Sequence, residues 1–206
     1  MVEVSKINNL IKFCLAGLSA RQKEVVEGRY GLTGPESSTL AELGGKYGLT
    51  RERVRQIEAL ALKAAKSKTE GAEFNDFVKA VSGSLRNAGG IKREDVLLSD
   101  VCGDSNDSRL KFLLEISGKF GYSKDDKNSY PYWYLSDTDK KKAEAFIGAL
   151  VKSADRENFA ASFASAAKSA GLSDAAARSY ASVSKKIAMN TYGDLGLSDW
   201  PEINPK

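Results

Sequence analysis

Five charged or amide-bearing residues stand close together at the start of one predicted helix, in the stretch TRERVRQIE from Thr50 to Glu58. They comprise three arginines, one carboxylate and one amide: Arg51, Glu52, Arg53, Arg55 and Gln56. Guanidinium groups pair with guanine or phosphate, an amide pairs with adenine, and a carboxylate accepts a hydrogen bond from the cytosine amino group. The set can therefore hold an anionic backbone and read the base edges beside it.

The residues around this stretch predict the elements that position it. Leu40, Leu43 and Tyr47 recur at intervals of three and four residues, which is typical of the apolar face of a helix. A tight turn is expected at 47–49. Thr50 can then cap a second helix by accepting a hydrogen bond from a free backbone amide of its first turn.

The apolar positions of the second helix leave its charged side chains outward. Val54, Ile57 and Ala61 fall on one face, and Gly44-Gly45 in the first helix predicts close helix packing. Two helices joined in this way form the layout of helix-turn-helix DNA recognition. The alternative is a solvated amphipathic helix whose charges bind nothing specific, and the turn, the cap and the preceding helix argue against it.

The same part of the chain resembles a known family. The resemblance is carried by LSARQKEVVEGRYGLTG (Leu18 to Gly34) and TLAELGGKYGLTRERVRQIEALALKAAK (Thr39 to Lys66). It is to region 4 of the bacterial primary sigma factors, covers about residues 8–68, and is most specific in TRERVRQIE. The resemblance implies a domain that binds the −35 promoter element.

The resemblance also implies roles for individual residues. Arg51, Glu52 and Gln56 would touch base edges, whereas Arg53 and Arg55 would mainly meet phosphates. The full predicted DNA-binding set is Thr50, Arg51, Glu52, Arg53, Arg55, Gln56 and Lys63. The family often has a basic residue where this chain has Leu60, so its promoter preference is not transferred, and Leu60 is expected to extend an apolar contact.

A complete sigma factor is not expected. Sigma factors open promoters through a region 2 that precedes region 4, and only 17 residues precede Leu18 here. We therefore expect a sigma-like DNA reader joined to a different C-terminal part.

Charge is distributed unevenly along the 206 residues. Residues 1–68 hold 12 Lys and Arg against seven Asp and Glu, whereas residues 69–206 hold 19 against 20. The net charge of +4 therefore lies in the first segment. A basic segment fits contact with phosphates, because released counterions supply much of the affinity for nucleic acid.

Other features predict a cytoplasmic protein. The chain has 42% hydrophobic residues, and no run of about 18 apolar residues that could span a membrane. Lys12 interrupts the apolar stretch near the start, which argues against a signal peptide. Cys14 and Cys102 lie in apolar settings and predict buried thiols, as in a reducing compartment.

The second predicted unit, 73–136, has the order of a winged helix. A helix ends at 87–90, a strand is expected at Ile91 with a helix from about Arg93, and Ser108 can cap a further helix. A hairpin follows over 118–136, with a polar turn at 123–129. Lys124 and Lys127 at its tip suggest a second DNA contact, but Asp125 and Asp126 lie beside them, so a protein-binding or structural role stays equally open.

Aromatic residues follow this turn: Tyr130, Tyr132, Trp133 and Tyr134. Such rings can stack on bases, but alternate residues of a strand face opposite sides, so packing in the core is the favoured interpretation. Pro131 predicts an edge strand.

The third predicted unit, 137–206, is helical with an irregular tail. A helix is expected after Thr138, and two more flank the turn AGLS at 170–173 in a second helix-turn-helix-like arrangement. The last of these helices is predicted to continue through KKIAMN, with Arg178, Ser182, Lys185 and Lys186 facing outward. Packing or partner binding is favoured there over DNA contact.

Enzymatic chemistry is not predicted. The chain has no His, which removes His-based triads and most zinc hydrolases. It also lacks a Cys-x-x-Cys pair and a phosphate-binding loop. Glu94-Asp95 and Asp137-Asp139 are acidic pairs, but acids beside lysines are more often solvated. We expect no catalytic residue, no metal and no cofactor.

The fold expected is therefore mainly α: a sigma region 4-like helix-turn-helix domain at 1–68, a winged-helix-like unit and a helical C-terminal unit. The function expected is sequence-specific binding of double-stranded DNA and transcription regulation, with helix 50–66 in the major groove. The alternative is a protein-interaction adaptor for RNA polymerase or for a phage, mobile-element or restriction partner. A homodimer stays open, and no membrane partner is expected.

Overall fold

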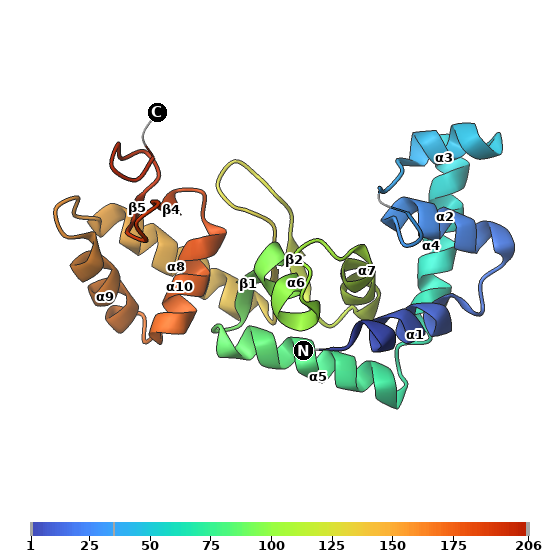
Figure 1. The fold of residues 1–206 in the computed structure, drawn as a ribbon, viewed down its shortest axis with the longest axis horizontal. Coiled ribbons are helices and arrows are strands. Elements are labelled where there is room, and N and C mark those ends of the chain that lie inside the picture. The colour runs from blue at the N-terminus through green and yellow to red at the C-terminus, as the bar shows by residue number, and fades with distance from the viewer. Residues whose placement is uncertain (1, 35, 205–206) are drawn as a thin grey trace. The chain divides into compact units, whose positions relative to one another are not determined.

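The chain is mainly helical, as predicted (Figure 1). The computed structural model describes residues 2–34 and 36–204, and within them the chain forms ten helices and five short strands. None of the described helices is both long enough and apolar enough to cross a membrane. Cys14 and Cys102 are buried free thiols, as expected, and burial raises the pKa of Cys14 to about 11.

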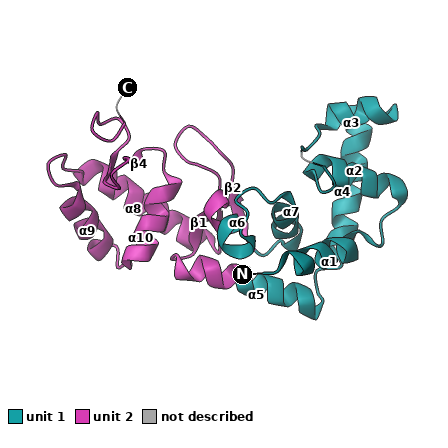
Figure 2. Cartoon of the chain, viewed as in Figure 1, with its two compact units in different colours: residues 1–80, 98–119 teal, residues 81–97, 120–206 magenta. Residues whose placement is uncertain are grey.

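The chain divides into two compact units (Figure 2). The first contains residues 1–80 and 98–119, and the second contains residues 81–97 and 120–206. Two of the boundaries fall within helices, α5 (Ala72–Asn87) and α6 (Glu94–Cys102), and the third falls at 119–120, outside any helix or strand. The predicted ranges 1–68, 73–136 and 137–206 follow other boundaries and stay predictions.

The first unit begins with four helices: α1 (Val4–Leu15), α2 (Ala20–Tyr30), α3 (Leu40–Tyr47) and α4 (Arg51–Lys66). Leu43 and Val54 are buried in one apolar cluster with Val25 of α2. Of the other predicted apolar positions, Leu40, Tyr47 and Ile57 pack partly buried against this cluster, and Ala61 is buried. Both predicted apolar faces are therefore confirmed.

The turn between α3 and α4 has the geometry that its sequence predicts. Gly48 ends α3 in the left-handed conformation, with φ 66°, which glycine adopts without a steric penalty. The Leu49 N–H donates to the Gly44 carbonyl at 2.8 Å. The Thr50 hydroxyl accepts a hydrogen bond from the Arg53 N–H at 3.2 Å, which confirms the predicted cap of α4.

The two adjacent glycines of α3 have different surroundings. A Cβ atom at Gly44 would lie 2.7 Å from the Leu49 carbonyl oxygen, whereas at Gly45 nothing lies within 4 Å. The predicted close approach therefore occurs at Gly44 and not at Gly45.

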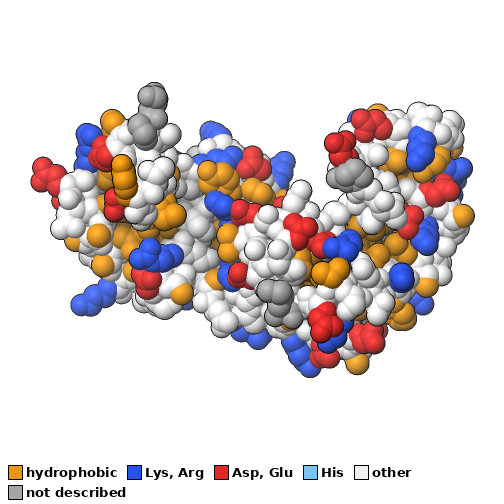
Figure 3. Space-filling model, in the orientation of Figure 1, with side chains coloured by type: hydrophobic (Ala, Val, Ile, Leu, Met, Phe, Trp, Pro, Cys, Tyr) orange, Lys and Arg blue, Asp and Glu red, His pale blue; other side chains and the backbone are white. Residues whose placement is uncertain are grey.

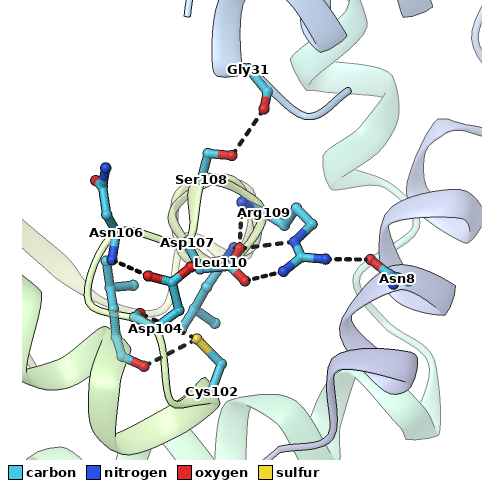
Figure 4. A network of polar contacts seen from close by, with 10 residues as sticks. Asn8, Gly31, Cys102, Asp104, Asn106, Asp107, Ser108, Arg109 and Leu110 are labelled. Atoms are coloured by element: carbon cyan, nitrogen blue, oxygen red, sulfur yellow. Dashed lines mark hydrogen bonds and ion pairs between the residues drawn. The ribbon is translucent and has the colours of Figure 1, made fainter. Parts of the chain in front are cut away.

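The polar network around the start of α7 (Ser108–Ser117) is held by a buried carboxylate (Figure 4). Asp107 caps α7, accepting hydrogen bonds from the backbone N–H groups of Arg109 and Leu110 and from the Arg109 guanidinium. Arg109 in turn donates to the Asn8 side chain of α1 at 2.9 Å. The predicted cap at Ser108 is wrong, because Asp107 occupies the capping position and Ser108 is the first residue of the helix, where its hydroxyl donates to the Gly31 carbonyl at 3.1 Å.

The second unit contains a three-stranded antiparallel sheet in the order β1-β3-β2, formed by β1 (Ile91–Arg93), β3 (Tyr132–Tyr134) and β2 (Gly121–Ser123). The predicted hairpin is confirmed, with Tyr122 opposite Trp133. The predicted edge strand is wrong, since β3 is central. Pro131 lies just before β3, outside the paired residues, so its missing N–H removes no hydrogen bond of the sheet. Its carbonyl accepts a hydrogen bond from the Glu94 N–H at 2.8 Å.

Two aromatic residues of β3 pack in the core, which is the interpretation that the sequence favoured. Tyr132 and Trp133 are buried, and the Trp133 indole N–H donates to the Glu94 carboxylate at 3.1 Å. Tyr130, just before the strand, is 39% exposed. The order over 72–134 is helix, strand, two helices and two strands, and its interpretation as a winged helix stays a prediction.

Three helices and a second hairpin complete the second unit: α8 (Asp137–Ser153), α9 (Phe159–Ser169), α10 (Asp174–Val183), β4 (Ile187–Met189) and β5 (Leu195–Leu197). The predicted continuation of the last helix is wrong. The predicted irregular tail contains the short strand β5, and turns follow over 198–204. The backbone leaves α10 at Ser184 because the Lys185 N–H bonds to the Asn128 carbonyl, at 2.8 Å. In β4 the first residue, Ile187, is buried, whereas the last, Met189, is exposed.

The contrast between the two glycines of α3 gives a first prediction. Gly44→Ala should destabilise the protein by about 1–3 kcal/mol, because the new methyl group meets a carbonyl oxygen that is fixed by the turn. Gly45→Ala, one residue on in the same helix, should be neutral or stabilise by up to about 1 kcal/mol, through helix propensity. Urea unfolding followed by circular dichroism compares the two, and equal effects would contradict the close approach.

The Asp107 network gives a second prediction. Asp107→Ala should lower the free energy of unfolding by about 2–4 kcal/mol, since it removes a helix cap and leaves the Arg109 guanidinium without its carboxylate. The control Asp76→Ala removes a carboxylate from an ion pair with Lys79 whose side chains are both 78% exposed. It should change stability by less than about 0.5 kcal/mol.

The loss at Asp107 should also depend on pH. Burial alone would raise the pKa of Asp107, but the Arg109 guanidinium and backbone N–H donors outweigh it, so the pKa lies below its ordinary value. A depressed carboxyl pKa stabilises the fold above the unfolded pKa and stops doing so as pH falls through the folded one. The difference between wild type and Asp107→Ala should therefore be full at neutral pH and shrink below about pH 4. A difference that stays constant to lower pH would contradict the ion pair.

Candidate nucleic-acid interface

The first two turns of α4 present a continuous polar surface to solvent. All seven predicted DNA-binding residues are exposed, from Thr50 at the cap to Lys63 near the end of the helix. Val54, Ala61 and Ala65 are buried on the opposite face of α4. The helix is therefore fixed by its apolar side and free along its polar side.

Four of the predicted residues form one network in the free protein. Arg55 donates two hydrogen bonds to the Glu52 carboxylate, from Nε at 2.8 Å and from Nη2 at 2.7 Å. The Gln56 amide lies 3.5 Å from the same carboxylate, and its oxygen accepts from Arg53 Nη1 at 3.1 Å. Within the described residues, the side chains of Arg51 and Lys63 have no hydrogen bond or ion pair.

This network stays charged at neutral pH. The Arg55 hydrogen bonds lower the pKa of Glu52, and the Glu52 carboxylate raises the pKa of Arg55. Both side chains are 59% exposed, so water and salt screen the pair. A nucleic-acid phosphate or base edge can therefore replace either partner without opening a buried contact.

The backbone at the start of α4 adds to this surface. The first four N–H groups of a helix have no partner within the helix, and Thr50 takes up one of them, that of Arg53. The remaining free N–H groups and the positive end of the helix dipole favour a phosphate at this position.

Two contacts that join α2 to the helix pair α3 and α4 do not appear among the predicted site residues. Arg29 of α2 forms an ion pair with Glu58 of α4 at 3.2 Å and also donates to the Ser38 carbonyl at 3.3 Å. Arg21 lies 4.1 Å from the centre of the Tyr47 ring, over its face. Both join residues more than 25 positions apart, and no local pattern signals such pairs.

One further missed contact did carry a local signal. The Thr39 hydroxyl accepts from the Glu42 N–H and the Glu42 carboxylate accepts from the Thr39 N–H, which forms a capping box at the start of α3. A threonine followed three residues later by a glutamate is the sequence pattern of this motif. This capping box fixes the residue at which α3, the first helix of the pair, begins.

Leu60 lies on the exposed side of α4. It is 59% exposed, so most of its side chain is open to solvent. The expected apolar contact is therefore not made within the first unit to any large extent.

Comparison with known proteins agrees with this geometry. Residues 14–66 match the family described as Sigma-70, region 4. The RNA polymerase sigma factor SigA1 of Synechococcus elongatus is 37% identical over 81 residues. That match covers 37% of this chain but only 20% of the relative, so the chain spans about a fifth of the length of the sigma factor that it resembles.

The matched residues include α2, the capped α3, the turn at Gly48 and the whole of α4. The match therefore covers the elements that build the exposed surface. Residues 14–66 of this chain are therefore similar to sigma-70 region 4, a family of DNA-binding helix-turn-helix domains.

Proposed function

We propose that this protein binds double-stranded DNA sequence-specifically and regulates transcription by reading a promoter-like element with the first turns of α4. The observation that carries the proposal is the exposed polar run at 51–56, with Val54 alone turned inward, on a helix fixed by a glycine turn and a threonine cap. The sigma-70 region 4 match supports it.

The side chains suit the two kinds of contact that such reading needs. Arg51, Glu52 and Gln56 can pair with guanine, cytosine and adenine edges. Arg53 and Arg55 can neutralise phosphates, which fixes the register of the helix on the duplex. In this scheme Arg55 exchanges Glu52 for a phosphate, and Glu52 becomes free to accept from a base. Lys63, more than two turns further along α4, extends the phosphate contact.

A second candidate function is that of an adaptor for RNA polymerase or another protein partner. The large apolar side chains that the first unit exposes include Phe13 on α1 and Leu60 on α4, at 53% and 59%. Exposed apolar side chains suit contact with a protein. DNA binding by the purified chain alone separates this function from DNA reading.

The predicted role of the base-reading residues is tested by selecting binding sites from random duplex DNA with the purified chain. The wild type should enrich a short motif, of the kind represented by TTGACA. Arg51→Ala combined with Gln56→Ala should relax base preference at specific positions, by about 1–3 kcal/mol of discrimination for each lost bidentate pair.

The matched control removes an exposed cation and an exposed amide from α1, through Lys12→Ala combined with Asn9→Ala. It should leave the selected motif unchanged. No enrichment by the wild type, with only weak salt-sensitive binding, would contradict sequence reading and favour the adaptor function.

The predicted role of Arg55 is tested by the salt dependence of affinity. Arg55→Ala should weaken binding to all duplexes to a similar extent and lower the slope of log affinity against log salt by about one, because one phosphate contact is lost. Fluorescence anisotropy at several salt concentrations measures both quantities. Lys79→Ala, which removes an exposed cation from α5, is the control. An unchanged slope for Arg55→Ala would show that Arg55 does not meet phosphate.

A further inference from the structure

The loop between β2 and β3 in the second unit is fixed to the segment that follows α10. Ser129 and Ser184 form an isolated antiparallel bridge. On either side of it, the Tyr130 N–H donates to the Val183 carbonyl at 2.9 Å and the Lys185 N–H donates to the Asn128 carbonyl at 2.8 Å. Two segments more than 50 residues apart in the sequence therefore form one surface.

The two acidic residues of the loop are used within this structure. Asp126 closes the turn, with its Oδ1 accepting from the backbone N–H groups of Asn128 at 2.7 Å and Ser129 at 2.6 Å. Asp125 forms an ion pair with Lys185 at 2.9 Å. The Lys185 ammonium also donates to the Asp126 carbonyl at 2.7 Å. The acids therefore hold the loop in place.

The exposed ring of Tyr130 contacts two cations beside this loop. The Arg93 guanidinium lies 4.9 Å from the centre of the Tyr130 ring, and the Lys185 ammonium lies 5.3 Å from it. Arg93 is held in turn by two hydrogen bonds to Asp95. Cation–π contacts of this kind restrict the ring and both cations. The loop therefore presents its remaining side chains from a fixed backbone.

Three lysines remain on this surface: Lys124, Lys127 and Lys186. All three are exposed, and none has an ion pair within the described residues. Lys127 and Lys186 each lie two residues from the Ser129–Ser184 bridge, on the two paired segments. We call Lys124, Lys127 and Lys186 the lysine surface. Figure 3 shows basic side chains over the loop between β2 and β3.

We infer that the lysine surface is a second contact for DNA, which binds the phosphate backbone of a duplex without reading its sequence. The inference rests on the proposed function, because it takes the ligand of α4 as the ligand of this surface. A lone helix-turn-helix buries little surface, and specific sites need further contacts to reach high affinity. Lysine is a flexible point charge and suits phosphate. The lysine surface itself contains no arginine or amide that could pair bidentately with a base.

The test compares two triple variants of the full chain on one duplex of about 30 base pairs, roughly three helical turns, that carries the selected motif. The first variant is Lys124→Gln, Lys127→Gln and Lys186→Gln. The control is Lys141→Gln, Lys142→Gln and Lys152→Gln, which removes the same charge from exposed positions on α8 of the same unit. Circular dichroism checks that both variants fold.

The lysine-surface variant should bind about tenfold more weakly at about 0.15 M salt, with a salt slope lower by about two to three. Its selected motif should be that of the wild type, and the control should match the wild type in affinity and slope. Wild-type affinity and slope in the lysine-surface variant would overturn the inference and leave α4 as the only reader. Equal competition by single-stranded DNA of the same length would overturn the duplex assignment.

The two proposals can fail separately. Salt-sensitive binding that the lysine-surface variant loses, with no motif enriched by the wild type, would support the surface and reject sequence reading by α4. A selected motif that depends on Arg51 and Gln56, with no effect of the three lysines, would do the reverse. Absence of any DNA binding by the wild type would reject both.

Discussion

The close backbone approach between α3 and α4 is the constraint on which the DNA-binding surface depends. The Leu49 N–H reaches the Gly44 carbonyl only because Gly48 adopts a left-handed conformation and Gly44 has no side chain in the way. The Thr50 cap then starts α4 at one defined residue. A helix that began one residue later would turn every side chain by about 100° around its axis. The outward direction of Arg51, Glu52 and Gln56 therefore follows from this turn.

The same turn occurs again in the second unit, with different chemistry. Gly171 is left-handed, the Leu172 N–H donates to the Ala167 carbonyl at 2.9 Å, and the Ser173 hydroxyl caps α10. The first six residues of α10, however, expose only Asp174, Ala175 and Arg178, and the two charged side chains pair with each other at 2.8 Å. They border an open hollow of about 880 Å³ between α9, α10 and the final hairpin. A shared turn therefore does not imply a shared ligand.

Charge in the second unit illustrates why net charge is a poor guide to a surface. In residues 81–97 and 120–206, which make up this unit, 15 Lys and Arg nearly balance 13 Asp and Glu. The fold uses Asp125 and Asp126 to close and anchor a loop, and this leaves neighbouring lysines without an acid partner. Composition counts these charges as equal, whereas in the structure the two acids make internal contacts and Lys124, Lys127 and Lys186 stay exposed.

The sequence by itself determined the helix-turn-helix and its exposed residues, because each signal there is local. The apolar spacing, the glycine turn, the threonine cap and the charged run all act within one or two helical turns, and all appear in the structure. The elements that sequence misjudged depend on partners far along the chain. The Ser108 hydroxyl, one residue after the Asp107 cap, bonds to Gly31; Pro131 precedes a central strand; and α10 ends where Lys185 meets Asn128. Only the tertiary structure could decide these three features. Each depends on a hydrogen bond or a strand pairing with residues far away in the sequence, which local patterns do not encode.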